Sequence, residues 1–340
     1  MKALVTGGGG FLGTRIVQML HARGDSVVAL GRRRYPHHER AGITTIQCDL
    51  RDAQAVKKAC EGMEVVFHAG AIPGIWGPRK VFWDINVGGT ANVLAACRAC
   101  GVAKLVYTSS PSVVFGREPL CGVDESQPYP DRYLAEYPRT KAVAERMVLT
   151  ANGTSPATVA LRPHLIWGPG DPHLIPRVVE RAKRGKLVQV GTGENLVDIT
   201  YIDNAAEAHL LAADALAPDA SCAGEVYFIS QAEPVKLWAW LGQILAALEV
   251  PPVTRSISYK TAYRFGAMFE TVYRLARVRR EPPMTRFLAS QLATSHYFDI
   301  GAAKRDLRYE PQVSTADGLI HLLAWLRAES TCVESAVLDP

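Results

Sequence analysis

Short apolar runs alternate with segments of helical periodicity along the first 230 residues of the chain. After an apolar run at residues 2–6, Phe11, Ile16, Val17 and Leu20 recur at the spacing of a helix, which Gly24 ends. Further apolar runs predict strands at Ser26–Leu30, Thr44–Cys48, Val65–His68, Lys104–Thr108, Thr158–Arg162 and Val226–Ser230. This alternation predicts an α/β fold with a parallel sheet covered by helices on both faces.

A glycine-rich turn joins the first predicted strand to the first predicted helix, with Gly7, Gly10 and Gly13 at its key positions. Such glycines permit a tight turn, the close approach of a pyrophosphate, and close packing of the helix on the sheet. The helix N-terminus adds amide donors and the positive end of its dipole. The sequence therefore predicts a Rossmann doubly wound sheet that binds a dinucleotide.

The residues after the second predicted strand indicate which dinucleotide binds. A carboxylate there would bind the adenosine ribose and repel a 2′-phosphate, but the chain reads Leu30-Gly31-Arg32-Arg33-Arg34. Arginines pair with phosphate through two donors, so we expect Arg32 and Arg33 to contact the 2′-phosphate of NADP(H) in the space that Gly31 leaves. The alternative is a solvated basic turn.

Composition is typical of a soluble enzyme: 340 residues, 48% hydrophobic, with a formal net charge of +5. Two runs, at 32–34 and 274–280, hold much of the basic excess, which favours local anion binding over a nucleic-acid surface. There is no apolar stretch of membrane-spanning length and no room for a signal peptide before the first strand, so we expect a cytoplasmic protein. The odd number of cysteines, seven, fits a reducing compartment. Cys97 and Cys100 fit helix packing better than metal binding.

The segment Tyr137-Pro138-Arg139-Thr140-Lys141 places a phenol and an ammonium one helical turn apart. A nearby cation lowers the cost of forming the phenolate, so the pair can work as a proton donor. The alternative is an exposed Tyr and Lys on a surface helix.

Beyond Pro163 the alternation of apolar runs and helical segments is less regular. Proline-rich connections at Pro169 to Pro176 and at Pro251-Pro252, with helical stretches between Leu237 and Leu275, predict a smaller C-terminal lobe. We expect residues 1–165 to form the dinucleotide-binding domain, to which a strand near 225–230 returns. Residues 166–224 and 231–330 form the substrate-binding lobe in this interpretation, and residues 331–340 form an irregular tail.

Several further motifs follow in order: Asp49-Leu50, His68-Ala69-Gly70-Ala71, Asn86-Val87-Gly88-Gly89-Thr90, Tyr107-Thr108-Ser109-Ser110 and Leu161-Arg162-Pro163. Together with the glycine turn and the Tyr-Lys pair, they make the chain resemble an extended short-chain dehydrogenase/reductase from residue 1 to about 325. Thr108–Gly116 and Tyr137-Pro138 resemble its 3β-hydroxysteroid and sterol-carboxylate dehydrogenase branch. The resemblance implies cofactor contacts at Gly7, Gly10, Phe11, Leu12, Gly13, Asp49, Leu50, Ala69, Gly70, Ala71, Tyr137, Lys141 and Pro163.

Within that branch, residues 161–174, 197–204 and 280–287 resemble the bacterial reductases of olefin biosynthesis. That resemblance implies NADPH-dependent reduction of a long-chain 2-alkyl-3-oxoalkanoic acid to its 2-alkyl-3-hydroxy acid, in association with other enzymes of that pathway. A steroid or sterol-carboxylate dehydrogenase is the first alternative, and a non-catalytic NADP-binding sensor or scaffold is the second. A sugar-nucleotide epimerase is disfavoured, because such enzymes prefer a carboxylate near position 31.

Ketone reduction needs a hydride, a proton and donors at the carbonyl oxygen. We expect Tyr137 to give the proton, and Lys141 to favour the phenolate and hold the nicotinamide ribose. Ser110 is expected to donate to the carbonyl oxygen, with Ser109 as the alternative. Asn86 is expected to hold a water behind Lys141.

Other segments carry weaker predictions. His164 and His173 flank a Gly-Pro loop without a carboxylate partner, which is more typical of structural residues than of substrate contacts. Asp203-Asn204 predicts a helix cap. The apolar residues of 259–280 favour a lid over an alkyl-binding cavity, with contact to a membrane surface as the alternative. Family resemblance implies a homodimer built on helices near 87–99 and 140–150, each expected to have surplus apolar surface.

Overall fold

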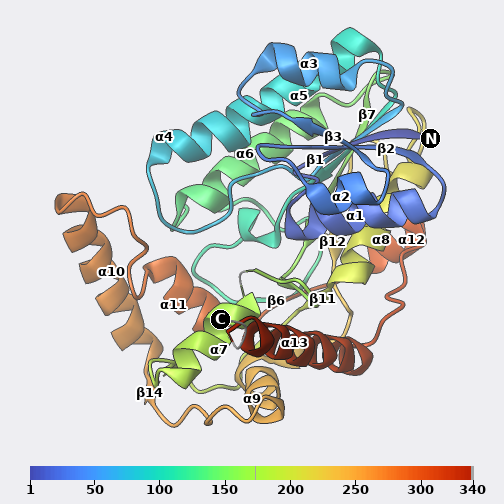
Figure 1. The fold of residues 1–340 in the computed structure, drawn as a ribbon. Helices are drawn as coiled ribbons and strands as arrows, with labels where there is room; N and C mark the ends of the chain where they lie inside the picture. Colours follow the sequence, from blue (N-terminus) through green and yellow to red (C-terminus); the bar gives the residue numbers. More distant parts are fainter. Residues whose placement is uncertain (173, 338–340) are drawn as a thin grey trace.

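The computed structural model describes residues 1–172 and 174–337, and side chains up to residue 328. A seven-stranded sheet forms its centre, in the order β3-β2-β1-β4-β5-β7-β12 (Figure 1). Every neighbouring pair in this sheet is parallel. Its strands are β1 (Lys2–Thr6), β2 (Ser26–Gly31), β3 (Thr44–Gln47), β4 (Val65–His68), β5 (Lys104–Thr108), β7 (Ala157–Pro163) and β12 (Val226–Ile229).

Helices cover both faces of the sheet, as Figure 1 shows. Leu4 of β1 packs with α3 (Ala53–Cys60), α5 (Gly89–Cys100) and α6 (Glu136–Thr150). Its neighbours Ala3 and Val5 point the other way, into the core formed with α1 (Phe11–Ala22) and α8 (Ile202–Ala215). Successive strand residues face opposite sides, so a sheet buried on both faces needs continuous apolar runs. The predicted doubly wound fold is confirmed.

The smaller elements lie around this sheet. The remaining helices are α2 (Pro36–Arg40), α4 (Arg79–Phe82) with a π-helix at Trp83–Gly88, a 3₁₀ turn at Pro111–Val113, α7 (Leu174–Lys183), α9 (Leu237–Ala247), α10 (Tyr259–Leu275), α11 (Arg286–Ala293), α12 (Gly301–Leu307) and α13 (Thr315–Val337). The short strands are β6 (Leu120–Val123), β8 (Ile166–Trp167), β9 (Gln189–Val190), β10 (Leu196–Val197), β11 (Thr200–Tyr201), β13 (Val235–Lys236), β14 (Ser256–Ile257) and β15 (His296–Phe298).

Two sequence predictions need correction. Helix α13 continues to Val337, so residues 331–337 are helical and do not form the irregular tail expected after residue 330. Asp203 and Asn204 lie inside the first turn of α8, whose N-cap is Tyr201, so neither is the cap. Asp203 instead binds Arg15 of α1 with oxygen–nitrogen distances of 2.7 and 2.8 Å. Within the part of the chain that the structure describes, no helix has the length and apolarity to cross a bilayer.

Candidate active site

The turn between β1 and α1 is tightly packed at two of its glycines. Gly7 has a φ of +70°, and a Cβ there would lie 2.7 Å from the Gly70 Cα. A Cβ at Gly13 would lie 2.1 Å from the Gly7 carbonyl oxygen. Side chains at either position would therefore push apart the turn, the helix and the segment after β4. The N-terminus of α1 has no acidic residue in its first turn, so its free amides are suited to bind phosphate.

A cavity of about 480 Å³ lies beside this turn, at the carboxyl ends of β1, β2 and β4. It brings together most of the expected cofactor contacts. Those that line it are Gly7, Gly10, Arg32, Arg33, Asp49, Leu50, Ala69, Gly70 and Ala71. The other expected contacts do not line it, namely Phe11, Leu12, Gly13, Tyr137, Lys141 and Pro163. Phe11 borders a neighbouring cavity of about 740 Å³, while Leu12 lies in the core.

The arginines at the cavity differ in their partners. Arg34 forms two hydrogen bonds with Glu39, at 3.2 and 2.9 Å. Arg32 and Arg33 are exposed, and neither guanidinium has a hydrogen bond or salt bridge within the described residues. Asp49 binds Arg51 through both oxygens, which lowers the pKa of Asp49 to about 2, with a smaller effect from Arg32. Two cations without a partner among the described residues, beside a cavity of about 480 Å³, fit a ligand that carries an extra phosphate.

Tyr35 occupies the space expected to be open at Gly31. A Cβ at Gly31 would lie 1.9 Å from the Tyr35 hydroxyl, and one at Gly9 would lie 1.8 Å from the Tyr35 ring. The Tyr35 side chain therefore bridges the glycine turn and the end of β2 at the wall of the cavity. Sequence reasoning missed Tyr35, because its position depends on the turn between β2 and α2.

Lys141 of α6 is buried against the carboxyl end of β5. Its Nζ donates a hydrogen bond to the Thr108 carbonyl oxygen at 2.5 Å and lies 4.1 Å from the centre of the Tyr107 ring. Burial lowers the pKa of Lys141 to about 7, although the charge of Glu145 acts to raise it. A lysine of this pKa changes charge near neutrality, as perturbed groups of active sites often do.

Tyr137 and Ser110 come together from two elements. Burial raises the pKa of the Tyr137 phenol, while a hydrogen bond with Ser110 acts to lower it. Ser110 also caps the 3₁₀ turn, where its Oγ accepts a hydrogen bond from the Ser112 amide at 3.2 Å. Ser109 is buried, and its hydroxyl has no hydrogen-bond partner among the residues that the structure describes. The contact with Tyr137 makes Ser110 the better-placed of the two candidate hydroxyls.

Asn86 fixes the start of the helix that carries Tyr137 and Lys141. Its Oδ1 accepts from the Ile72 amide at 2.8 Å, and its Nδ2 donates to the Thr140 hydroxyl at 3.0 Å. Thr140 in turn donates to the carbonyl oxygens of Glu136 and Tyr137. Asn86 thus joins α6 to the segment that lines the cofactor cavity, and its predicted role in holding a water stays a prediction.

Glu145 is a further residue of this site that sequence reasoning missed. It is fully buried one turn beyond Lys141 and accepts hydrogen bonds from Arg162 at 2.7 and 3.0 Å. The Tyr129 hydroxyl donates a third hydrogen bond to it, at 2.7 Å. The available signal was its i+4 spacing from Lys141, which places both side chains on one helix face.

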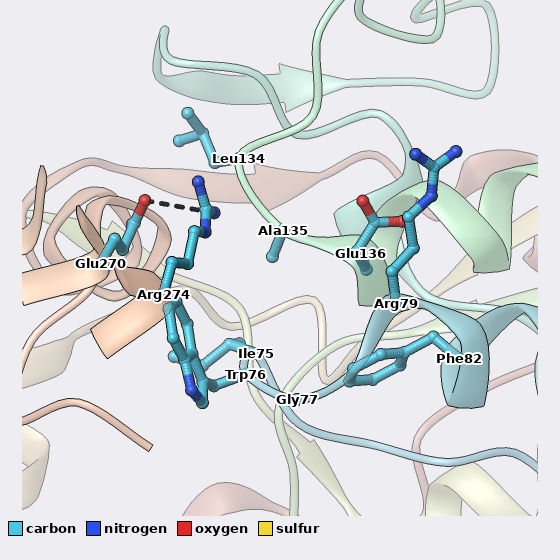
Figure 2. A pocket seen from close by; sticks show the side chains of 10 residues that line it. All are labelled: Ile75, Trp76, Gly77, Arg79, Phe82, Leu134, Ala135, Glu136, Glu270 and Arg274. Atoms are coloured by element: carbon cyan, nitrogen blue, oxygen red, sulfur yellow. Dashed lines mark ion pairs between the residues drawn. The ribbon is translucent and has the colours of Figure 1, made fainter. Parts of the chain in front are cut away.

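A second cavity, of about 390 Å³, lies at the N-terminal end of α6, where Ala135 and Glu136, the two residues before Tyr137, line it (Figure 2). Figure 2 shows Glu270, Arg274 and Trp76 on one side, with Arg79, Glu136 and Phe82 on the other. The ion pair within each wall is loose: Arg274 and Glu270 are 3.7 Å apart, and Arg79 and Glu136 are 3.8 Å apart. The cavity is lined by Ile75, Trp76, Gly77, Arg79, Phe82, Leu134, Ala135, Glu136, Glu270 and Arg274. It offers apolar surface and two cations to a ligand.

Two other predictions for the site had different outcomes. His164 is buried, and its Nε2 lies 2.7 Å from Nδ1 of His296, so it has a structural partner; His173 lies outside the described residues.

The lid predicted from the apolar residues of 259–280 is wrong in its orientation. Phe265 and Val272 of α10 face solvent, and α10 lines the second cavity with Glu270 and Arg274. The physical reason is that small residues form the inner face of α10, where a Cβ at Gly266 would lie 2.6 Å from the Arg286 amide nitrogen.

Comparisons with known proteins agree with this geometry. The model of the 3-beta hydroxysteroid dehydrogenase/isomerase family matches residues 4–258. The chain is 52% identical over 326 residues to the 2-alkyl-3-oxoalkanoate reductase of Stenotrophomonas maltophilia, covering 95% of this chain and 99% of that protein. It is 50% identical over 332 residues to the reductase of the same name from Shewanella oneidensis, covering 95% and 86%.

More distant relatives extend the match. The chain is 34% identical over 321 residues to the decarboxylating sterol-4-alpha-carboxylate 3-dehydrogenase of Mus musculus, covering 92% of this chain and 87% of that protein. The structure of MoeE5 in complex with UDP-glucose and NAD matches with a TM-score of 0.74 at 26% identity, covering 97% and 99% of the two chains. The chain therefore belongs to the 3-beta hydroxysteroid dehydrogenase/isomerase family of extended short-chain dehydrogenases/reductases, which are oxidoreductases acting on hydroxyl and keto groups.

Proposed function

We propose that this protein reduces a long-chain 2-alkyl-3-oxoalkanoic acid to its 2-alkyl-3-hydroxy acid, as a step of olefin biosynthesis. The observation that carries the proposal is the contact of Tyr137 with Ser110, together with the bond of buried Lys141 to the Thr108 carbonyl at the carboxyl end of β5, on the sheet edge that also holds the cavity at Gly7 and Gly70. Two relatives of about half-identical sequence, both named 2-alkyl-3-oxoalkanoate reductase, support the choice of substrate.

The residues at the site divide the proton chemistry between them. A bound nicotinamide cofactor supplies the hydride, and the chain supplies the proton. Tyr137 gives its phenolic proton to the developing alkoxide, while Ser110 donates a hydrogen bond to the same oxygen. The Lys141 ammonium stabilises the resulting phenolate, and Asn86 is a positioning residue for the helix that carries both.

We propose NADP(H) as the cofactor. Arg32 and Arg33 border the cavity, and among the described residues neither guanidinium has a partner. Strand β2 ends at Gly31, so no carboxylate stands there to repel a 2′-phosphate. The Tyr35 ring, between Gly9 and Gly31, offers a surface for the adenosine end of the cofactor.

For the substrate, we propose that the cavity beside Tyr137 holds the alkyl branch and the carboxylate. Ile75, Phe82 and Leu134 supply apolar surface. Arg274 is the better-placed cation, because Glu270 is already neutralised by Arg286 through hydrogen bonds of 2.7 to 3.0 Å. Arg79 lies on the opposite wall and can act with it (Figure 2).

The test is NADPH oxidation with 2-alkyl-3-oxo acids of increasing length, their methyl ketones and a 3-oxosteroid. Each newly buried methylene contributes about 0.8 kcal/mol, so kcat/KM should rise about fourfold per methylene until the cavity is filled. Arg274→Gln should raise KM for the acids about tenfold and leave the ketones unchanged. Arg139→Gln is the matched control, because Arg139 also lies near Glu136 but does not line the cavity. A flat dependence on chain length would contradict the proposal.

A 3β-hydroxysteroid or sterol-carboxylate dehydrogenase remains the second candidate, favoured by the family match over residues 4–258. That enzyme would prefer the 3-oxosteroid in the same panel and would tolerate loss of the carboxylate. A non-catalytic NADP-binding sensor would bind NADPH and turn over none of these compounds.

We further propose a homodimer through α5 and α6, on the strength of family membership. The surplus of apolar surface expected there is not seen: Val143, Met147 and Leu149 are half-buried, and none of the exposed large apolar side chains described belongs to either helix. Such an interface would use small residues such as Ala91 and Ala95. Light scattering at micromolar concentration tests this assembly, and a monomer would refute it.

A further inference from the structure

Exposed large apolar side chains are concentrated on one short segment. Of the six in the described chain, five lie between residues 265 and 278, and the sixth is Ile320 of α13. Leu275 is 81% exposed and Val272 51% exposed. The five side chains are Phe265, Met268, Val272, Leu275 and Val278.

The first four of these follow helical spacing and form one face of α10. The opposite face, with Ala262, Gly266 and Glu270, is buried. Glu270 is bound to Arg286, and the Tyr259 hydroxyl lies 3.0 Å from that of Ser290, so α11 holds the inner face of α10. Figure 1 shows α10 at the outer edge of the molecule, with α11 on its inner side. The apolar face is therefore fixed outward and has no partner in the described chain.

The exposed charged side chains of residues 259–280, which surround this apolar face, are all basic. Residues 259–280 expose six basic side chains, and their only acidic residue, Glu270, is buried and paired. The exposed basic residues are Lys260, Arg264, Arg274, Arg277, Arg279 and Arg280. An adjoining cavity of about 520 Å³ adds Arg177, Arg181, Arg184 and Lys186, partly balanced by Glu180 and Glu281. An apolar stripe next to uncompensated positive charge matches the acyl chains and headgroups of an anionic bilayer.

We propose that α10 and the segment up to Arg280 dock on the surface of an anionic phospholipid bilayer. Phe265, Met268, Val272 and Leu275 enter the boundary between headgroups and acyl chains, while Arg277, Arg279 and Arg280 bind lipid phosphates. The inner side of the same helix lines the cavity beside Tyr137 with Glu270 and Arg274. Docking therefore brings that cavity to within one helix diameter, roughly 10 Å, of the membrane, where an alkyl ligand would be concentrated. The proposed membrane-binding surface of α10 does not depend on the proposed reductase activity.

The experiment is sedimentation of the full-length protein with vesicles of phosphatidylcholine, with and without phosphatidylglycerol. Because a basic residue near an anionic surface contributes about 1 kcal/mol, Arg277→Gln/Arg279→Gln should weaken binding about thirtyfold. Val272→Gln/Leu275→Gln should weaken it at least about tenfold, by removing apolar burial. Matched controls are Ile320→Gln, an exposed apolar residue elsewhere, and Lys57→Gln/Lys58→Gln on exposed α3, and both should bind as the wild type does.

Binding should require phosphatidylglycerol and should fall as salt is raised. Turnover of a water-soluble ketone by the variants should equal that of the wild type, which shows that the fold is intact. No binding to either vesicle, or equal losses in the controls, would overturn the proposal. If Val272→Gln/Leu275→Gln instead converts a dimer to a monomer in light scattering, the face is a contact between copies of the chain and the proposal is wrong.

Discussion

The buried pair of Glu145 and Arg162 offers the sharpest test of how this site is built. Glu145→Gln keeps the shape of the side chain but removes its charge. Arg162, 2% exposed, would then remain charged in the core with an amide as its partner. The same change removes the negative charge that acts to raise the pKa of Lys141.

The effect of Glu145→Gln on stability and its effect on the pKa of Lys141 are measured separately. Removing one partner of a buried ion pair costs about 3 to 5 kcal/mol, because the remaining charge is uncompensated. Part of this loss is avoided here, since the amide oxygen of the introduced glutamine can still accept from the Tyr129 hydroxyl, which lies 2.7 Å from Glu145 in the structure. We therefore expect the free energy of unfolding to fall by about 3 kcal/mol, at the lower end of that range. The pKa of Lys141 should fall below its present value of about 7.

Urea unfolding at pH 7 measures the first effect, and the pH dependence of kcat/KM for ketone reduction measures the second. The control is Glu145→Gln/Arg162→Met. The methionine removes the uncompensated charge and packs against Tyr129 and Phe228, whose rings the guanidinium contacts. Stability should return to within about 1 kcal/mol of the wild type, because replacing both partners of a buried pair is often neutral. The shifted pH profile should persist in this double variant.

Two results would refute this reasoning. If Glu145→Gln unfolds at the same urea concentration as the wild type, the pair does not stabilise the fold. If the double variant also restores the wild-type pH profile, the charge of Glu145 does not act on Lys141, and the change in the single variant came from distortion of α6.

Three further predictions concern the reaction. Tyr137→Phe should lower turnover by on the order of a hundredfold and leave NADPH binding nearly intact, as expected for loss of a general acid; wild-type turnover would contradict the assignment. Arg32→Ala should reduce the preference for NADPH over NADH about tenfold in kcat/KM, whereas Arg51→Ala, which frees only Asp49, should not. Because the pKa of Lys141 is about 7, kcat/KM for reduction should fall as the pH rises through 7 and the ammonium is lost. Lys141→Arg should remove that inflection, since arginine stays charged.

Local signals made the sheet and the glycine turn predictable. The strand predicted at Lys104–Thr108 matches β5 in full, and Val65–His68 matches β4, because apolar runs end at turn residues there. The narrow space around Gly7 and Gly13 follows from a strand that turns directly into a helix, which the spacing of glycines already encodes.

Features that depend on contacts between distant residues were not predictable. Glu145 meets Arg162 only because α6 packs on β7, and no pattern in one segment specifies that register. The orientation of α10 was predicted wrongly for a similar reason. Its periodicity correctly indicates an amphipathic helix, but the choice of the buried side depends on the close approach of α11 at Gly266.

The position of Tyr137 follows from polar bonds along α6 more than from apolar packing. Ala144 and Val148 bury a smooth apolar surface against one part of the core and Ala142 packs into another, which resists separation of the helix from the sheet but sets its axial position poorly. Thr140 bonds to Asn86, Lys141 to the Thr108 carbonyl, and Glu145 to Arg162 of β7. These three bonds reach three different elements, so a shift of the helix along its axis would break all of them together. Tyr137, one turn from Lys141, is therefore held at a fixed distance from Ser110, as a proton donor requires.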